Sequence, residues 1–230
     1  MPTVTVLMPI FNRPEYLRQA IDSVIVQTFP DWELWAMDDG STLPGVWPIV
    51  QAYAEQDRRI VPCHFDTTVA ERLASVRYST LINWGVAHSE SEYVTYLCND
   101  DWYFPDRLER MLAKLHEGHD VVYGPQAYAN ADGTLLGTHR WAEEPMDRAR
   151  SRIDLNSVMH TRESFVKAGG FPTEPDPMTW RQADGLFWDR LSDQGYIFIP
   201  VDDYESPTDA KRYGNRGVDL NVQEGLDPWA

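Results

Sequence analysis

A pair of acidic clusters, each following an apolar run, is the part of this sequence best suited to chemistry. Asn99, Asp100 and Asp101 follow the run at 92–98, and an Asp-Asp-Gly-Ser cluster at 38–41 follows another run. Carboxylates are the oxygen ligands with which proteins hold Mg²⁺ or Mn²⁺, often shared with substrate phosphates. Acids also favour the first turn of a helix, and Pro105 opens one, so residues 99–101 fit a metal site and a helix N-terminus equally well. The cluster at 38–41 has the composition of an ordinary turn.

Two arginines lie in the segment between the acidic clusters. Arg72 and Arg77 are five residues apart, and either is suited to contact a diphosphate or a base. Most arginines on helices face solvent instead, so their position alone leaves both interpretations open. A binding site is favoured because both acidic clusters, and a Phe-Asn-Arg sequence at 11–13, follow runs that predict strands.

The first hundred residues supply a regular alternation of elements that would bring these clusters together. Apolar runs predict strands, and helical periodicity between them predicts helices, as in the spacing of Leu17, Ala20, Ile21 and Val24. This alternation is typical of right-handed βαβ units in a mostly parallel sheet, so the predicted fold class is α/β. Ligands of such sheets bind beyond the carboxyl ends of the strands. The predicted strands are 4–10, 32–37, 59–65 and 92–98, and the predicted helices begin at Pro14, Pro44, Val69 and Pro105, the third of them reaching Val86.

The pattern changes after Val121. Short apolar runs at 121–123 and 134–136 flank an Ala-Asp-Gly turn at 131–133, which predicts a small antiparallel addition in the C-terminal half. A helix around Asp184 and a strand at 197–201 follow. From Asp202 the chain is polar, so residues 202–230 are predicted to form a tail that is either a mobile flap or disordered.

Composition limits the partners of the chain. A formal charge of −16 makes a nucleic-acid partner unlikely, since binding a phosphate backbone needs clustered Lys and Arg. No apolar run reaches the length of a membrane span, and the first residues lack the basic start of a signal peptide, so a soluble cytoplasmic protein is expected. Cys63 and Cys98, in strand-like segments, are interpreted as buried free thiols.

Four segments together resemble family 2 glycosyltransferases of the GT-A fold, the spore-coat polysaccharide type in particular. They cover roughly residues 1–200 and occur in the family's order. The two longer ones are VTVLMPIFNRPEYLRQAIDSVIVQTFPDWELWAMDDGS and RYSTLINWGVAHSESEYVTYLCNDDWYFPDRL, and the shorter ones are DLNSVMHTRESF and RQADGLFWDRL. The resemblance implies a catalytic domain at 1–201, with a nucleotide-binding half at 1–104 and an acceptor-binding half at 105–201.

The resemblance also implies roles in binding a nucleotide-sugar donor. Asp39 would accept a hydrogen bond from the imide N–H of uracil or thymine, with Pro9 and Phe11 in the same pocket. Arg72 would contact the base, and Arg77 would lie near the donor. The implied donor is therefore a UDP- or dTDP-sugar.

The metal and catalytic positions follow from the same resemblance. Asp100 matches the aspartate that binds the divalent metal, Mg²⁺ or Mn²⁺. Asn99 stands where the spore-coat polysaccharide type has an aspartate that contacts the ribose. Cys98 stands where most of the family has the first acid of its metal motif. Asp101 is able to compensate for these departures. Asp184 matches the catalytic base.

The resulting hypothesis is an inverting, metal-dependent glycosyltransferase of the hexosyltransferase type acting on a small-molecule or glycan hydroxyl. One carboxylate deprotonates the acceptor, and the metal stabilises the departing diphosphate. A nucleotidyltransferase is the first alternative, but its Gly-rich start and its lysine are not found after residues 4–10. A catalytically impaired binding module is the second, favoured only by Cys98 and Asn99. Among the histidines, His116 and His119 are expected in solvent, and His160 either lines the acceptor side or packs internally.

Overall fold

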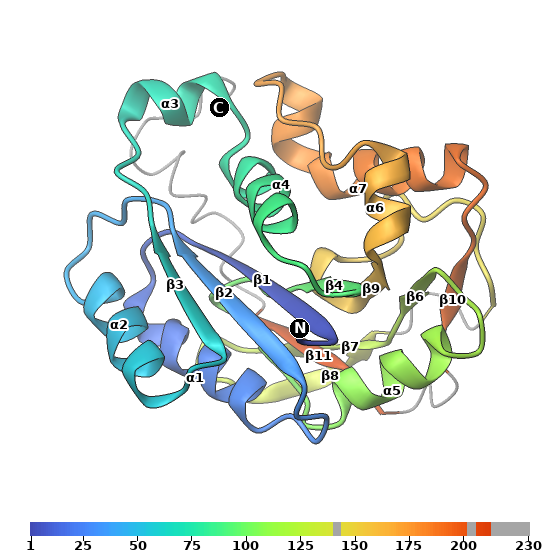
Figure 1. Ribbon diagram of the computed structural model, residues 1–230, viewed down its shortest axis with the longest axis horizontal. Coiled ribbons are helices and arrows are strands. Elements are labelled where there is room, and N and C mark those ends of the chain that lie inside the picture. The colour runs from blue at the N-terminus through green and yellow to red at the C-terminus, as the bar shows by residue number, and fades with distance from the viewer. Residues whose placement is uncertain (140–143, 202–205, 213–230) are drawn as a thin grey trace.

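Seven strands form the main sheet of the computed structural model, which describes residues 1–139, 144–201 and 206–212. All neighbouring strands are parallel except β9, which is antiparallel to both of its neighbours. The mostly parallel α/β sheet predicted from the sequence is therefore confirmed. The strands, in spatial order, are β10 (Phe198–Pro200), β6 (Val121–Tyr123), β9 (Val158–Thr161), β4 (Tyr93–Tyr96), β1 (Val4–Ile10), β2 (Trp32–Asp38) and β3 (Ile60–His64) (Figure 1).

Helices cover both faces of this sheet because its central strands are apolar on both sides. In β1, Val4, Val6 and Met8 belong to one core cluster and Leu7 to the other. The first cluster includes α1 (Pro14–Ile25), α2 (Val46–Gln56) and α5 (Arg107–Leu115), and the second includes α4 (Arg77–His88), α6 (Arg162–Ala168) and α7 (Pro177–Asp193). Figure 1 shows the first three helices below the sheet and the last three above it.

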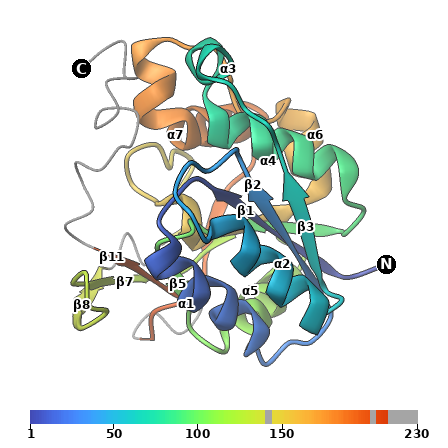
Figure 2. The same cartoon turned by 90° about the vertical axis from the view of Figure 1, so that its left-hand side faces the viewer.

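A second, four-stranded sheet lies beside the main one. Its order is β5 (Trp102–Tyr103), β11 (Asp209–Arg212), β7 (Gln126–Ala129) and β8 (Leu135–His139). Figure 2 shows β7 and β8 projecting at the lower left, away from α3 (Val69–Ala74) and α7 at the top. The predicted antiparallel addition is thus present as the pair β7–β8.

The predicted partner of the strand at 134–136 is wrong. Residues 121–123 form β6, which pairs with β9 and β10 in the main sheet, and β8 pairs with β7 instead. All three residues of β6 are buried, as expected for a run that is apolar at successive positions and covered on both faces.

The predicted helix from Val69 to Val86 is also wrong as a single element. The chain forms α3, then Ser75 and Val76 in extended conformations, then α4. The N–H of Val76 donates to the carbonyl of Thr173 at 3.0 Å, so a distant segment stabilises the extended backbone between the two helices. The other predicted elements agree with the structure to within a few residues at their ends.

The fold continues beyond residue 201. Residues 209–212 form β11 inside the second sheet, so this part of the predicted polar tail belongs to the domain. Residues 202–205 and 213–230 of that tail lie outside the described residues. Cys63 and Cys98 are free thiols and partly buried, and every helix in the described ranges falls short of what crossing a bilayer requires.

Candidate active site

Asp39 lies at the centre of a buried charge cluster. It follows β2 as Phe11 follows β1, and the two strands end together because Ile10 pairs with Asp38 in parallel register. The carboxylate, 2% exposed, accepts hydrogen bonds from Arg72 Nη1 at 3.0 Å, Arg77 Nη2 at 2.6 Å and Thr67 Oγ1 at 2.6 Å. We call Phe11, Asp39, Thr67, Arg72 and Arg77 the base cluster. A carboxylate held by two guanidinium groups is ionised and fixed in orientation.

The break between α3 and α4 is what brings both arginines to Asp39. In one continuous helix, residues five apart point about 140° away from each other. With extended residues between the two helices, Arg72 at the end of α3 and Arg77 at the start of α4 reach the same carboxylate. The guanidinium of Arg72 also lies 3.5 Å from the centre of the Phe11 ring. Phe11, Arg72 and Arg77 therefore lie around Asp39, and Pro9 is partly exposed in β1, two residues before Phe11.

The acidic loop, residues 99–101, follows β4 at the same edge of the sheet. Asn99 Nδ2 donates to the carbonyl of Asn12 at 2.9 Å, which joins this loop to the end of β1. The Asp100 carboxylate forms an ion pair with Arg13. The loop thus lies next to the residues that precede α1.

Asp101 has a different environment from Asp100. Its carboxylate is 3% exposed and accepts hydrogen bonds from Asn156 Nδ2 at 2.6 Å and from the backbone N–H of Arg212 at 2.9 Å. Burial, with the negative charges of Asp100 and Asp154 nearby, raises the pKa of Asp101 well above its ordinary value. Both oxygens are engaged, so Asp101 connects the acidic loop to the 3₁₀ turn at Leu155–Ser157 and to β11.

Three side chains of this region are close enough to share a cation. Ligand atoms of Cys98, Asp100 and Asp101 all lie within 4.8 Å of one another. Burial raises the pKa of the Cys98 thiol well above its ordinary value, and a protonated thiol is a poor ligand for a hard cation. Both Asp101 oxygens accept hydrogen bonds, one of them from the backbone, whereas Asp100 is paired with the side chain of Arg13, so of the two carboxylates Asp100 is the one that could hold Mg²⁺ or Mn²⁺. Such ions are often held by one or two carboxylates together with substrate phosphates and water.

Asp184 lies just after a kink in α7. The kink is at Gln182, whose φ of −147° and ψ of 35° are not helical. The backbone N–H of Asp184 donates to the hydroxyl of Tyr78 at 3.2 Å, and its Oδ1 accepts the N–H of Gly185 at 2.8 Å. Burial, with a smaller contribution from the charge of Asp154, raises the pKa of Asp184 to about 6. A carboxylate with that pKa is mostly ionised at neutral pH and is a stronger base than an exposed aspartate.

The start of α4 joins the base cluster to Asp184. Arg77 and Tyr78 are consecutive residues, and they contact Asp39 and Asp184 respectively. The predicted donor residues and the predicted base are therefore parts of one site, although they are 145 positions apart in the sequence.

Several charged residues of the site are absent from the sequence predictions. Asp154 pairs with Lys211 on β11, and both charges act on Asp184. Arg150 donates to Gln182 at 3.3 Å and to Asp189 at 2.7 Å, so it bridges the kink of α7. Asp154 lies in DLNSVMHTRESF, one of the four segments that resemble the family, so the resemblance could have pointed to it. Lys211 lies in the segment predicted to be a polar tail, where nothing in the sequence marks it.

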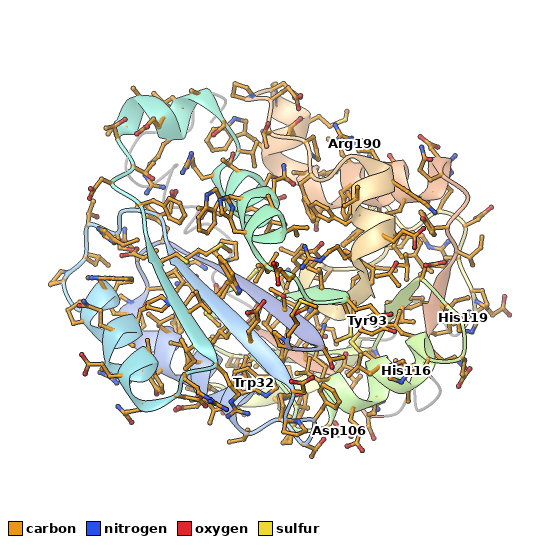
Figure 3. All side chains as sticks on the ribbon, viewed as in Figure 1. Trp32, Tyr93, Asp106, His116, His119 and Arg190 are labelled. Atoms are coloured by element: carbon orange, nitrogen blue, oxygen red, sulfur yellow. The ribbon has the colours of Figure 1, made fainter. Side chains whose placement is uncertain are left out.

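The histidines singled out in the sequence are His116, His119 and His160. His160 is fully buried, accepts or donates a hydrogen bond with the Tyr96 hydroxyl at 2.5 Å and stacks on Phe165, and burial lowers its pKa to about 4. Of its two predicted environments, the internal one is therefore correct. Figure 3 places His116 and His119 beside α5 at the lower right, whereas α3 lies at the upper left.

Comparison with solved structures identifies the fold as GT-A. Staphylococcus aureus TarS (residues 1–349, in complex with UDP) superposes with a TM-score of 0.72 at 17% identity, covering 93% of this chain and 61% of that one. The mannosyltransferase PcManGT from Pyrobaculum calidifontis, in complex with GDP-Man and Mn²⁺, gives a TM-score of 0.66 at 16% identity, covering 96% and 59%.

Sequence comparison then gives the family. Residues 5–184 match the model of glycosyl transferase family 2, and the chain belongs to that family. Protein CgeD of Bacillus subtilis (strain 168) is 34% identical over 209 residues, which are 87% of this chain and 48% of CgeD. TuaG of the same organism, named for teichuronic acid biosynthesis, is 30% identical over 187 residues, 78% of this chain and 71% of TuaG. The chain thus spans about half the length of CgeD.

Proposed function

We propose that this chain transfers a sugar, with inversion, from a UDP- or dTDP-sugar to a hydroxyl of a small-molecule or glycan acceptor. The observation that carries the proposal is the pair of contacts at the start of α4. Arg77 binds the carboxylate of the base cluster, and Tyr78 binds the backbone of Asp184. A donor site and a carboxylate of raised pKa are thereby held by two consecutive residues.

The base cluster is suited to a pyrimidine imide. Asp39 is an ionised acceptor, and the guanidinium groups beside it are donors for the flanking ring carbonyls. Both Asp39 oxygens already accept hydrogen bonds, so an imide N–H would replace one of them. The contacts from Arg77 Nε, at 3.1 and 3.2 Å, are the longest and the easiest to replace. TarS has been solved with UDP and with UDP-GlcNAc, which supports a uridine donor here.

Asp100 is the residue that would hold Mg²⁺ or Mn²⁺. A bound divalent cation supplies Lewis-acid stabilisation of the negative charge that grows on the departing diphosphate. Asp101 braces the acidic loop through Asn156 and Arg212, so it would position Asp100 without acting as a ligand. The Mn²⁺ of the PcManGT complex supports the choice of ion.

Asp184 would act as the general base. Its carboxylate takes the proton of the acceptor hydroxyl as that oxygen attacks the anomeric carbon from the side opposite the diphosphate. Proton transfer of this kind contributes about 10²–10⁴-fold to the rate. The α7 kink and the Tyr78 hydroxyl keep the first residues after Gln182 in place, so the carboxylate is oriented before an acceptor arrives.

The test is release of the nucleoside diphosphate from a panel of UDP- and dTDP-sugars with Mn²⁺, in the presence and absence of candidate acceptors. We expect release by the wild type and loss of release in the Asp184→Asn variant. Asp193→Asn is the matched control, because Asp193 ends the same helix but is exposed and paired with Arg148. Nucleotide binding without any turnover would identify a binding module, and no binding of either nucleotide class would refute the donor site.

A further inference from the structure

Arg13 already occupies the carboxylate to which the metal is assigned. Its guanidinium forms an ion pair with Asp100, and the two side chains are 22% and 11% exposed. The pair lies at the junction of β1, α1 and the acidic loop, since Asn12 next to it accepts a hydrogen bond from Asn99 at 2.9 Å. The guanidinium of Arg13 therefore lies where the divalent metal ion is expected to bind.

The backbone at this point is held in an unfavourable conformation. Asn12 and Arg13 both have positive φ, 57° and 59°, which residues with a Cβ rarely adopt. The Asn12 side chain fixes it, because its Oδ1 accepts the N–H of Thr42 at 2.9 Å and of Leu43 at 2.8 Å. Strained residues kept in place by their surroundings occur most often at functional sites. Arg13 is also the residue before α1, where its side chain makes no cap hydrogen bond and pairs with Asp100 instead.

We propose that Arg13 is a displaceable counter-ion of Asp100 that becomes a ligand of the donor diphosphate when the metal binds. The proposal rests on the proposed function, since it assumes that a divalent cation binds Asp100. Before binding, the guanidinium balances a carboxylate that has the buried Asp101 carboxyl nearby. A divalent cation and a guanidinium repel each other, so a metal bound at Asp100 weakens the contact between Asp100 and Arg13. The sugar-nucleotide diphosphate brings new negative charge to the same place, and guanidinium groups bind phosphate oxygens in pairs.

This exchange couples metal and donor. Metal alone has to displace Arg13 from Asp100, so it binds weakly. Metal together with a diphosphate gives Arg13 a new anionic partner, so the two ligands bind cooperatively, and each raises the affinity for the other by the same factor. A residue that only braced the acidic loop would give the opposite effect, because its removal would weaken the metal site.

The experiment measures two affinities in Arg13→Gln, Arg13→Lys and the control Arg58→Gln, which removes the same charge from an exposed turn. The first is the affinity for Mn²⁺ alone, measured by electron paramagnetic resonance. The second is the affinity for UDP at saturating Mn²⁺, measured by calorimetry. In Arg13→Gln we expect Mn²⁺ alone to bind roughly fivefold to tenfold tighter and UDP to bind roughly fivefold to tenfold weaker, near the lower end of common coupling factors. Arg13→Lys keeps the charge but not the paired N–H donors, so Mn²⁺ binding is expected to stay within about threefold of wild type and UDP binding to weaken less than in Arg13→Gln.

Each outcome either supports or overturns the role proposed for Arg13. Unchanged or weaker Mn²⁺ binding in Arg13→Gln, with Mn²⁺ bound normally by the wild type, overturns the counter-ion role and leaves the proposed function standing. If Arg13→Gln does not fold, UDP binding by Arg13→Lys weakened more than tenfold would still refute a role based on charge. If wild type and Asp100→Asn bind Mn²⁺ equally, the metal assignment is wrong, and this inference is wrong with it.

Discussion

Replacing Asp184 by Asn should make the enzyme inactive and its fold more stable. The pKa of Asp184 is raised by burial to about 6, so the folded protein disfavours the ionised form. If the carboxylate were fully buried, that difference from an ordinary aspartate would correspond to about 3 kcal/mol. The side chain is partly exposed, so we expect about 1–2 kcal/mol. The Asn side chain is neutral and keeps the oxygen that accepts the Gly185 N–H.

The sign of this effect depends on pH. Because the pKa is higher in the folded than in the unfolded chain, the wild type has its full stability below about pH 4 and loses part of it as pH rises through 6. The Asp184→Asn variant does not titrate there. Urea unfolding should therefore give equal free energies of unfolding near pH 4 and a higher value for the variant, by about 1–2 kcal/mol, at pH 8.

Activity should change in the opposite direction. Turnover of Asp184→Asn should fall roughly 10²-fold or more, while donor affinity by calorimetry stays within about threefold, since a general base acts on the acceptor in the transition state. In the wild type, kcat/KM should fall about tenfold per pH unit below 6, and the product should have the anomeric configuration opposite to that of the donor.

Two results would refute this reasoning. A variant less stable than wild type at pH 8 would mean that the ionised carboxylate is stabilised by its surroundings. A wild-type rate independent of pH between 5 and 7, or near-normal turnover of the variant, would mean that the base is elsewhere. The Asp193→Asn control should match wild type in both stability and rate.

Three further predictions concern the rest of the site. Asp100→Asn should abolish the Mn²⁺-dependent part of UDP binding in calorimetry, whereas Asp101→Ala should mainly lower the free energy of unfolding, by about 1–3 kcal/mol, because the Asn156 amide and the Arg212 N–H both lose their acceptor; the reverse pattern would exchange their roles. UDP and TDP should raise the melting temperature more than ADP, because adenine has no imide donor for Asp39, and equal shifts for all three would exclude base reading. Gly185→Ala should lower turnover more than donor affinity, because a Cβ there would lie 2.9 Å from Arg150 Cγ and disturb the kink of α7; unchanged turnover would show that the kink does not position the base.

The parts of the fold that follow from local chemistry were predictable. The strands β1 to β4 are short runs of mostly apolar residues, and α1 has its buried residues at helical spacing after Pro14. The break between α3 and α4 was not predictable in this way. It depends on a hydrogen bond from Val76 to Thr173, nearly a hundred residues away, while the local sequence is compatible with helix throughout.

The strand β11 escaped prediction for a related reason. Its sequence, Asp-Ala-Lys-Arg, is polar, and such a run is typical of an exposed tail. Its charges have partners in other elements, since Asp209 accepts a hydrogen bond from Gln126 at 2.6 Å and Lys211 pairs with Asp154. Buried polar groups of this kind are stable when every partner is in place, and the partners come from other elements.

The different environments of the adjacent acids Asp100 and Asp101 could not be predicted from the sequence either. Sequence gives Asp100 and Asp101 as an equivalent pair, but their neighbours separate them into a carboxylate paired with a cation and a carboxylate fastened to the backbone of Arg212. Cys98, which replaces the usual first acid, cannot restore the charge because its thiol is protonated. The proposed metal site therefore depends on one carboxylate, and the loop that carries it is held by Asn156 and β11 through Asp101. The proposed donor site thus depends on residues that follow it in the sequence, and a chain ending at residue 201 would lose the β11 contact that supports the acidic loop.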